Sequence, residues 1–162
     1  MVFGINSSPF MAQYVAQKHA ESHKDELPLA AETVLESTYM DDSMDSIADD
    51  QKGIELYLQL SELWSRAGMH ARKWLSNSAV LLQKIPFEDR VAEVDLDSGF
   101  LPSIKTLGII WSTKNDAFTF KAYSPGEEFV YTKSNFLKKL ATLFDPLGFL
   151  GPFTIRGKML LQ

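Results

Sequence analysis

The stretch of sequence that decides the fold is TVLESTYMDDSMDSI, residues 33–47. The polar pair Asp41 and Asp42 divides it into two short runs with strand character, so the stretch predicts a β-hairpin with the aspartates at its turn. In a straight strand, neighbouring side chains point to opposite faces of the sheet. At a chain reversal, by contrast, both carboxylates can project towards one point.

Two adjacent carboxylates at a turn favour a divalent cation, because like charges this close repel each other unless a cation or a base neutralises them. Hard ions such as Mg²⁺ (or Mn²⁺) prefer oxygen ligands and keep several waters. Two such metals about 4 Å apart can activate a 3′-hydroxyl and stabilise a leaving pyrophosphate. Asp41 and Asp42 are therefore the candidate catalytic and metal-binding residues of this chain.

An ordinary surface turn is the alternative interpretation of the same residues. Asp-Asp alone is such a turn in roughly nine cases of ten. The full tetrapeptide Tyr39-Met40-Asp41-Asp42 arises by chance in only about one chain of this length per thousand. The tetrapeptide, set between two expected strands, therefore favours a functional site over a surface turn.

Outside this stretch, the sequence predicts an α+β fold with antiparallel strand pairs. Ser8 suits the N-cap of a first helix, and Pro9 suits its first position, where a missing N–H costs nothing. The large apolar residues of segment 10–15 fall on one side of that helix. Beyond it we expect a connector over 27–29, a second helix capped by Asp49 or Asp50 and ended by Gly68, a strand over 70–75, a second hairpin over 107–120, and helical stretches over 136–143 and 155–161.

Composition excludes several classes of protein. The chain has 162 residues, 45% of them hydrophobic and 23% charged, which is typical of a soluble globular domain and argues against disorder or a coiled coil. No apolar run approaches the roughly 18 residues of a membrane span, and the first residues do not form a signal-peptide pattern. The absence of cysteine excludes disulfides and thiolate catalysis.

Charge is distributed unevenly along the chain. Residues 1–69 carry a net charge of −8, residues 70–130 of −1 and residues 131–162 of +4. The acidic first part argues against a free-standing nucleic-acid-binding protein, which usually has a basic surface. The basic end suits contact with a phosphate backbone, or it is a solvated helix face.

The Tyr-Met-Asp-Asp hairpin resembles that of the reverse transcriptases of retroelements, and its neighbours resemble that family in the same order. Phe3-Gly4 followed by Ser8-Pro9 is similar to the family's loop and helix that contact template and incoming nucleotide. The second helix, Gly68 and the segment through Lys73 are similar to the next motif of the polymerase palm. Leu107-Gly108-Ile109-Ile110-Trp111 is similar to the hairpin that grips the primer end.

The C-terminal part resembles a narrower group. The sequence FDPLGFLGP, residues 144–152, closely resembles the stretch after the palm in Pol polyproteins of BEL/Pao retrotransposons. The resemblance implies a partial polymerase palm over residues 1–122, with antiparallel hairpins and packed helices. A helical, thumb-like or connection-like segment follows over residues 123–162.

The resemblance also implies the role of each site residue. Asp41 and Asp42 would be catalytic and would hold the metal, Mg²⁺ or Mn²⁺. Partners of the intact enzyme would be an RNA or DNA template–primer, deoxynucleoside triphosphates and the rest of the Pol polyprotein. No membrane would be among its partners. The enzyme would be intracellular, either cytoplasmic or in retroelement particles. Template and nucleotide binding would fall to Phe3, Gly4, Ser8, Pro9, Tyr39, Met40 and Lys73, and the primer grip to Leu107, Gly108, Ile109, Ile110 and Trp111.

One departure from the family matters for activity. Family polymerases hold their metals with a further aspartate on an upstream strand, which would lie before Met1, and residues 1–38 contain no substitute, since Asp25 has no apolar strand around it. We therefore expect the isolated chain not to polymerise DNA. A non-catalytic remnant of a retroelement is one alternative.

An aspartic peptidase is the other alternative. Asp97-Ser98-Gly99 resembles the Asp-Ser/Thr-Gly loop of retroviral-type peptidases, in which two aspartates share one proton. Against it, Phe100 replaces the usual small residue after the glycine, and a tripeptide match has a high false-positive rate. Sequence families that cover this part of BEL/Pao polyproteins carry a Pao retrotransposon peptidase name, so a peptidase label is expected on either interpretation.

Overall fold

The computed structural model describes residues 6–99, 101–106, 109–119, 130–143, 145 and 148–160. The chain forms two compact units, Met1–Leu101 and Pro102–Gln162. Helices and small antiparallel sheets both occur, so the α+β class expected from the sequence is confirmed. The boundary expected between residues 122 and 123 lies outside the described residues. No helix in the described segments is both long and apolar enough to cross a membrane.

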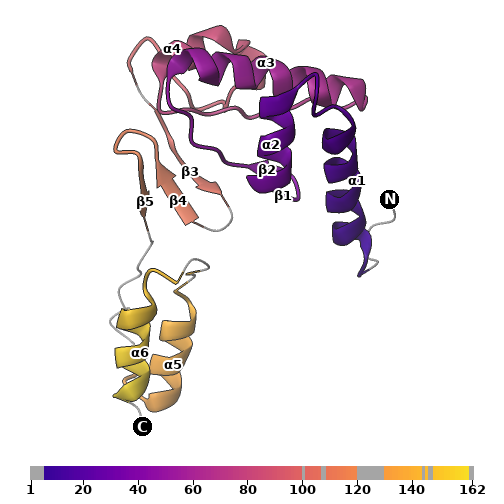
Figure 1. Ribbon diagram of the computed structural model, residues 1–162. Helices are drawn as coiled ribbons and strands as arrows, with labels where there is room; N and C mark the ends of the chain where they lie inside the picture. The colour runs from indigo at the N-terminus through magenta and orange to yellow at the C-terminus, as the bar shows by residue number, and fades with distance from the viewer. Residues whose placement is uncertain are drawn as a thin grey trace. The chain divides into compact units, whose positions relative to one another are not determined.

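The first unit is built on a layer of three helices, drawn in indigo to magenta in Figure 1. Helix α2 packs against both α1 and α3. Between α2 and α3 the chain forms the short hairpin β1–β2, and after α3 come two short helical pieces. The bounds are α1 Ser8–Ser22, α2 Pro28–Glu36, β1 Thr38–Tyr39, β2 Asp42–Ser43, α3 Asp50–Arg66, α4 Ala79–Lys84 and the 3₁₀ turn Phe87–Asp89.

Two clusters of buried side chains hold this unit together. The first lies between the three long helices, where small residues of α1 and α2 allow close approach to the leucines of α3. The second lies between α3, α4 and the loop that follows, with Tyr57 packed edge-to-face on Trp74 at 5.0 Å between ring centroids. The buried residues are Ala20, Leu27, Ala30, Ala31, Val34, Leu56, Leu60 and Leu63 in the first cluster, and Tyr57, Leu82, Ile85 and Val94 in the second.

Helix α3 begins and ends where the sequence predicts. Asp49 is its N-cap, and the carboxylate Oδ1 accepts a hydrogen bond from the Lys52 amide at 2.8 Å. At the other end Gly68 has φ +69, the left-handed conformation that glycine adopts without strain. The amides of Gly68 and Met69 donate to the carbonyls of Ser65 and Trp64, both at 2.9 Å, which is the pattern of a Schellman cap.

Helix α2 was not expected from the sequence. The connector predicted over 27–29 is wrong, because Pro28 opens a helix that runs to Glu36, and the expected strand beginning at Thr33 is correspondingly shortened. No local side chain caps α2. Its first free amides, Leu29 and Ala30, instead donate to Oε1 of Gln59 on α3, at 2.9 and 3.3 Å. A cap supplied from so far along the chain leaves no local signal, which is why sequence patterns miss this helix.

Helix α1 differs from its prediction in two ways. Its N-cap is Ser7 rather than Ser8, and Pro9 lies in the first turn as expected. The large apolar side that the spacing identifies faces solvent, with Phe10 69% exposed. The side that packs on the core carries small residues instead, Ala16 and Ala20. Small side chains let α1 approach its neighbours closely, so they form the inner face despite their lower hydrophobicity.

The strand predicted over 70–75 is also wrong. This segment is a loop with a single bridge, in which the Trp74 amide donates to the Asp89 carbonyl at 2.8 Å and the Trp74 carbonyl accepts from Val91 at 3.0 Å. Lys73, next to the bridge, has φ +61, which no regular strand contains. The Schellman turn at Gly68 and this left-handed residue together prevent the segment from extending.

The second unit contains a three-stranded antiparallel sheet in the order β3-β4-β5. The hairpin expected over 107–120 is confirmed by β4 Ile109–Ser112 and β5 Ala117–Thr119, whereas β3 Ser103–Thr106 was not expected. Across the sheet, Trp111 pairs with Ile104 on one side and with Phe118 on the other.

Two further helices lie side by side in this unit, α5 Lys133–Ala141 and α6 Gly151–Met159 (Figure 1). Both helical stretches were expected, but α6 begins earlier than predicted, because Pro152 stands in its first turn rather than breaking it. Gly157 permits their close approach, since a Cβ there would lie 2.9 Å from Cδ1 of Leu140.

Candidate functional site

The hairpin β1–β2 forms a two-residue turn with the predicted motif at its tip. Thr38 pairs with Ser43 and Tyr39 with Asp42, which leaves Met40 and Asp41 as the turn residues. The prediction of a hairpin is therefore confirmed, with the difference that Asp42 is the first residue of β2 rather than part of the turn. Both carboxylates are exposed to solvent. Asp41 and Asp42 are thus consecutive, exposed residues at a chain reversal.

The backbone at the tip is unusual. Met40 has φ +60, whereas the first position of a two-residue hairpin turn with positive φ is normally glycine. A non-glycine residue in this region costs free energy and persists where the surroundings fix it. The turn is therefore held in place by contacts from outside the hairpin.

Contacts from α2 fix the base of the hairpin. The Thr38 hydroxyl donates to the Thr33 carbonyl at 3.0 Å and lies 2.7 Å from the Ser43 hydroxyl on the opposite strand. The buried Thr33 hydroxyl donates to Oδ2 of Asp45 at 2.5 Å, which fixes the segment after β2 as well. The base is thus attached to the end of α2 on both strands.

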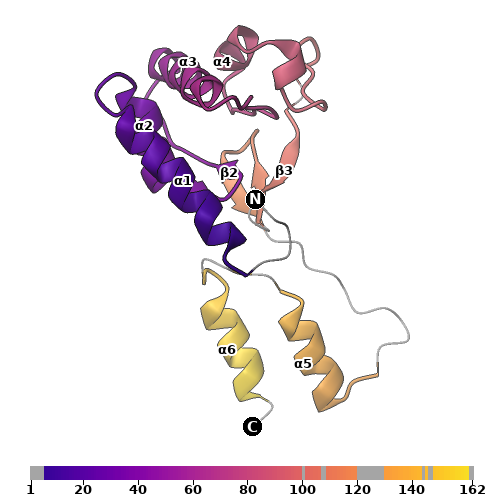
Figure 2. The ribbon, with the colours of Figure 1, turned by 90° about the vertical axis from the view of Figure 1, so that its right-hand side faces the viewer.

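A contact from α1 fixes the tip. The side-chain amide of Gln13 donates from Nε2 to the Thr38 carbonyl at 2.9 Å, and its Oε1 accepts from the Met40 amide at 2.8 Å. Figure 2 shows α1 and α2 passing beside β2. Gln13 belongs to none of the motifs in the sequence. The available signal was its position, since Gln13 shares with Ala16 and Ala20 the small-residue side of α1, where a polar side chain needs a partner.

The two aspartates fit part of the ligand set of a magnesium ion. Mg²⁺ is usually bound by one or two carboxylates, several waters and substrate phosphates, and the exposed tip leaves space for all of these. Among the described residues, no group of three or more His, Cys, Asp or Glu side chains is placed to hold a metal. Asp41 and Asp42 could therefore hold a hydrated ion, but no further protein ligand stands beside them in that part of the chain.

The other predicted binding residues fall in several places. Ser8 and Pro9 form the start of α1, the helix that carries Gln13, and Tyr39 and Met40 are exposed in the hairpin. Lys73 is exposed in the loop after α3. The primer-grip segment forms β4 in the second unit, with Ile109 buried and Ile110 and Trp111 half-buried. Phe3, Gly4, Leu107 and Gly108 lie outside the described residues.

The Asp97-Ser98-Gly99 loop has the geometry of a surface turn. The carboxylate of Asp95 organises it: Oδ1 accepts from the amides of Asp97 and Ser98 at 3.1 and 3.2 Å, and Oδ2 accepts from the Ser98 hydroxyl at 2.7 Å. These bonds, first of all that from the Ser98 hydroxyl, lower the pKa of Asp95. Asp97 itself is exposed, whereas a peptidase dyad needs two enclosed carboxylates. The geometry gives the peptidase alternative no support.

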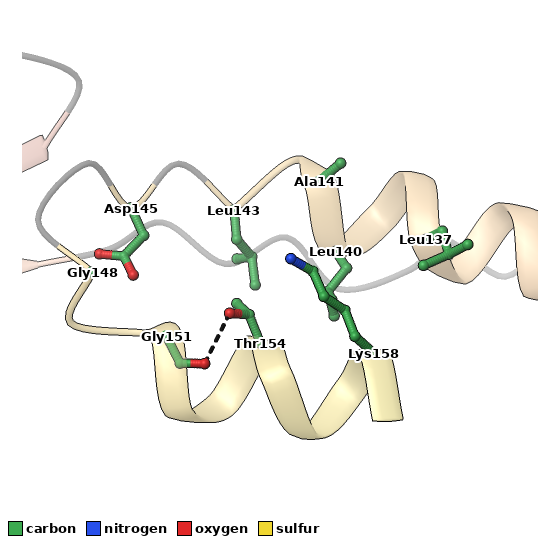
Figure 3. Close-up of a pocket in the computed structure, with 9 residues that line it drawn as sticks. All are labelled: Leu137, Leu140, Ala141, Leu143, Asp145, Gly148, Gly151, Thr154 and Lys158. Atoms are coloured by element: carbon green, nitrogen blue, oxygen red, sulfur yellow. Dashed lines mark hydrogen bonds between the residues drawn. The ribbon is translucent and has the colours of Figure 1, made fainter. Parts of the chain in front are cut away.

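A pocket of about 490 Å³ lies between α5 and α6 (Figure 3). Its walls are mainly apolar, with Leu140 and Leu143 on the α5 side. At one end Asp145 accepts a hydrogen bond through Oδ2 from the Leu150 amide at 2.6 Å, while its Oδ1 is buried and has no hydrogen-bond partner. Lys158, from α6, also lines the pocket. The remaining lining residues are Leu137, Ala141, Gly148, Gly151 and Thr154.

Residues 132–162, which contain α5 and α6, match a family model described as Pao retrotransposon-like RNaseH-like domain. No curated protein matches the chain, and no solved structure matches it. The match supports a Pao-type retrotransposon origin, as the resemblance of residues 144–152 implies. It covers the C-terminal segment alone, so it says nothing of the hairpin.

The description names an RNase H-like domain, where a peptidase name was expected. Hydrolysis of nucleic acid by two metals requires several carboxylates. The matched segment has one acidic residue, Asp145, against five lysines and arginines. A nuclease site is therefore not contained in the matched residues by themselves. The finding bears on the Pao-type retrotransposon origin of the matched segment.

Proposed function

We propose that this chain is part of a retroelement Pol protein and that its hairpin supplies Asp41 and Asp42 to the catalytic site of an RNA-directed DNA polymerase. The observation that carries the proposal is the placement of Tyr39-Met40-Asp41-Asp42 on an exposed two-residue hairpin with both carboxylates accessible. The Pao-type match of residues 132–162 supports the retroelement origin. The assignment to a polymerase is our own step beyond that match.

In this proposal the chain contributes charge and position. Asp41, at the turn, and Asp42, at the start of β2, would hold Mg²⁺ or Mn²⁺. The ion would neutralise charge as a primer 3′-hydroxyl attacks the α-phosphate of a deoxynucleoside triphosphate and pyrophosphate leaves. The Thr38 hydroxyl donates to the Thr33 carbonyl and the Met40 amide donates to Gln13, and these hydrogen bonds hold the turn that carries the two aspartates. Tyr39 and Met40, exposed beside them, are available to contact the nucleotide or primer end.

Metal binding at the tip is the first test. Mn²⁺ added to the whole chain should broaden the NMR signals of residues 39–43 more than those around Asp49 and Asp50, the chain's other Asp-Asp pair. This pair is a matched comparison, because it has the same two side chains in sequence. It should bind Mn²⁺ less well, because the Asp49 carboxylate already accepts a hydrogen bond as the cap of α3. D41N and D42N should each abolish the selective broadening, and D50N should leave it intact. Equal broadening at both pairs would contradict the proposal.

Polymerase activity is the second test. The isolated chain should not extend a primer, because no third metal-binding side chain accompanies Asp41 and Asp42 in the described segments. A Pol protein that includes this chain should extend the primer with Mg²⁺, and D41N should lower the rate about a thousandfold, corresponding to about 4 kcal/mol of lost transition-state stabilisation. Unchanged extension by D41N would refute the role of Asp41, and Mg²⁺-dependent synthesis by the isolated chain would refute the expected inactivity.

A further inference from the structure

The side chain of Gln13 makes two hydrogen bonds to the backbone of the hairpin, on both sides of Tyr39. Nε2 donates to the Thr38 carbonyl at 2.9 Å, and Oε1 accepts from the Met40 amide at 2.8 Å. Gln13 is half-buried in the middle of α1, so its position is fixed by the packing of that helix on the core. One amide group thus connects a rigid helix to the turn that carries the aspartates.

The hairpin needs such a connection. It has two residues in each strand, and isolated two-stranded hairpins are at best marginally stable in water. The bonds from α2 reach Thr38 and the segment after β2, which are at the base. Among the described residues, Gln13 supplies the side-chain hydrogen bond at the tip, to the residue whose φ of +60 is strained.

The chemistry of the glutamine suits this position. The contact requires a donor for the Thr38 carbonyl and an acceptor for the Met40 amide at the same time, and a side-chain amide offers both. A glutamate retains the acceptor and loses the donor, while a methionine of similar length loses both. The site therefore discriminates between side chains of nearly equal size.

We propose that Gln13 is a positioning residue that holds Met40 in its left-handed conformation and thereby aims Asp41 and Asp42. The part concerning metal rests on the function proposed above. The part concerning the tip rests only on the two hydrogen bonds and the strained φ. Gln13 acts through the hairpin backbone and does not itself touch metal or substrate.

The experiment compares the whole chain with Q13M, Q13E and Q17M. Gln17 lies one turn further along the same helix and serves as the matched control. For each chain we would measure hydrogen exchange of the Met40 amide, the Met40 coupling constant and Cα shift that report its φ, Mn²⁺ broadening at residues 41 and 42, and exchange of the Leu60 and Leu63 amides in the core.

In Q13M the Met40 amide should exchange about tenfold faster, as expected for the loss of one net hydrogen bond. Its φ signature should also average away from the left-handed value, and Mn²⁺ binding should weaken severalfold. Q13E should keep most of the Met40 protection, because its carboxylate still accepts that bond. Q17M should match the wild type, and the core amides should be unchanged in all four chains.

Each other outcome has a defined meaning. An unchanged Met40 amide and φ signature in Q13M overturns the inference. Altered Met40 signals with unchanged Mn²⁺ affinity overturn the claim that Gln13 aims the carboxylates. If the wild-type chain binds no Mn²⁺ at the tip while Q13M still alters Met40, then the proposed polymerase function fails and the role of Gln13 in fixing the turn stands.

Discussion

The helical layer α1–α3 and the helical pair α5–α6 differ greatly in how far they bury their apolar side chains. The layer buries eight apolar residues completely or nearly so, and side chains such as Gln13 and Gln59 make hydrogen bonds between its segments. The described residues of α5 and α6 include none that is buried, and Phe149, Phe153 and Met159 are largely exposed. Hydrophobic burial is the main stabilising contribution to folding, so the two parts should differ greatly in stability.

The family match and the candidate catalytic residues lie in different parts of the chain. The family match lies in the pair, residues 132–162, whereas the hairpin with the candidate catalytic residues is fixed by the layer. Of these two parts, the one that indicates the origin of the chain therefore has fewer buried residues among those the structure describes. The segment that carries the proposed chemistry is held by the core of the layer, which lies outside the matched residues.

Loss of a core side chain should give the largest effect, and it should be confined to the layer. Leu63 is fully buried between the three helices, so L63A should lower the free energy of unfolding by about 3 kcal/mol through lost burial and the cavity left behind. Urea denaturation of the whole chain followed by circular dichroism measures it. L58A, on the same helix with Leu58 59% exposed, should change stability by less than about 0.5 kcal/mol. Equal effects of the two variants would contradict the assignment of the core.

A smaller effect should come from overfilling the contact between α5 and α6. A Cβ at Gly157 would lie 2.9 Å from Leu140 and 3.6 Å from Phe136, and the added methyl groups of G157V would force the helices apart at a cost of about 1–3 kcal/mol. Loss of NOE contacts between Phe136 and residue 157 would report the separation. G151V is the control, since a Cβ at Gly151 meets nothing within 4 Å. Retained NOE contacts in G157V would contradict the close approach of α5 and α6 at Gly157.

The smallest effect should be a pH dependence in the layer. The Arg66 guanidinium hydrogen-bonds the Glu26 carboxylate, with Nη1 2.7 Å from Oε2, and lowers the pKa of Glu26 below its ordinary value of 4.5. A lowered pKa in the folded state means that this contribution is fully present above pH 4.5 and is lost as the pH falls through the folded value. An NMR titration of Glu26 should show the lowered pKa, and R66Q should return it towards 4.5. The same midpoint in both chains would exclude the ion pair in solution.

The parts of the fold that sequence predicts are those with local signals. Asp49 at the start of α3 and Gly68 at its end are local caps, and both are where the pattern places them. Helix α2 is missed because its cap is Gln59, and β3 is missed because Ser103–Thr106 has little strand character without β4 beside it. Contacts between distant segments decide these elements, and a single sequence does not display such contacts.

The candidate site divides in the same way. The hairpin and the adjacency of Asp41 and Asp42 follow from a tetrapeptide and its turn, so they are predictable. The strained φ of Met40 and its hydrogen bond to Gln13 join residues 27 positions apart, and they depend on how α1 packs. The segment around Lys73 is the opposite case, because its local sequence predicts a strand that the structure does not contain. Its neighbour Trp74 forms a single bridge, and the segment is a loop.

The cap on α2 has a consequence for the order in which the elements of this unit fold. The amides of Leu29 and Ala30 find their acceptor on Gln59, so the first turn of α2 is complete only after α3 has docked. Helix α2 in turn supplies Thr33, which fixes the base of the hairpin. In a growing chain that ends before residue 59, the hairpin that carries Asp41 and Asp42 would therefore lack the contacts that fix it. The acidic tip would be among the last parts of this unit to fold.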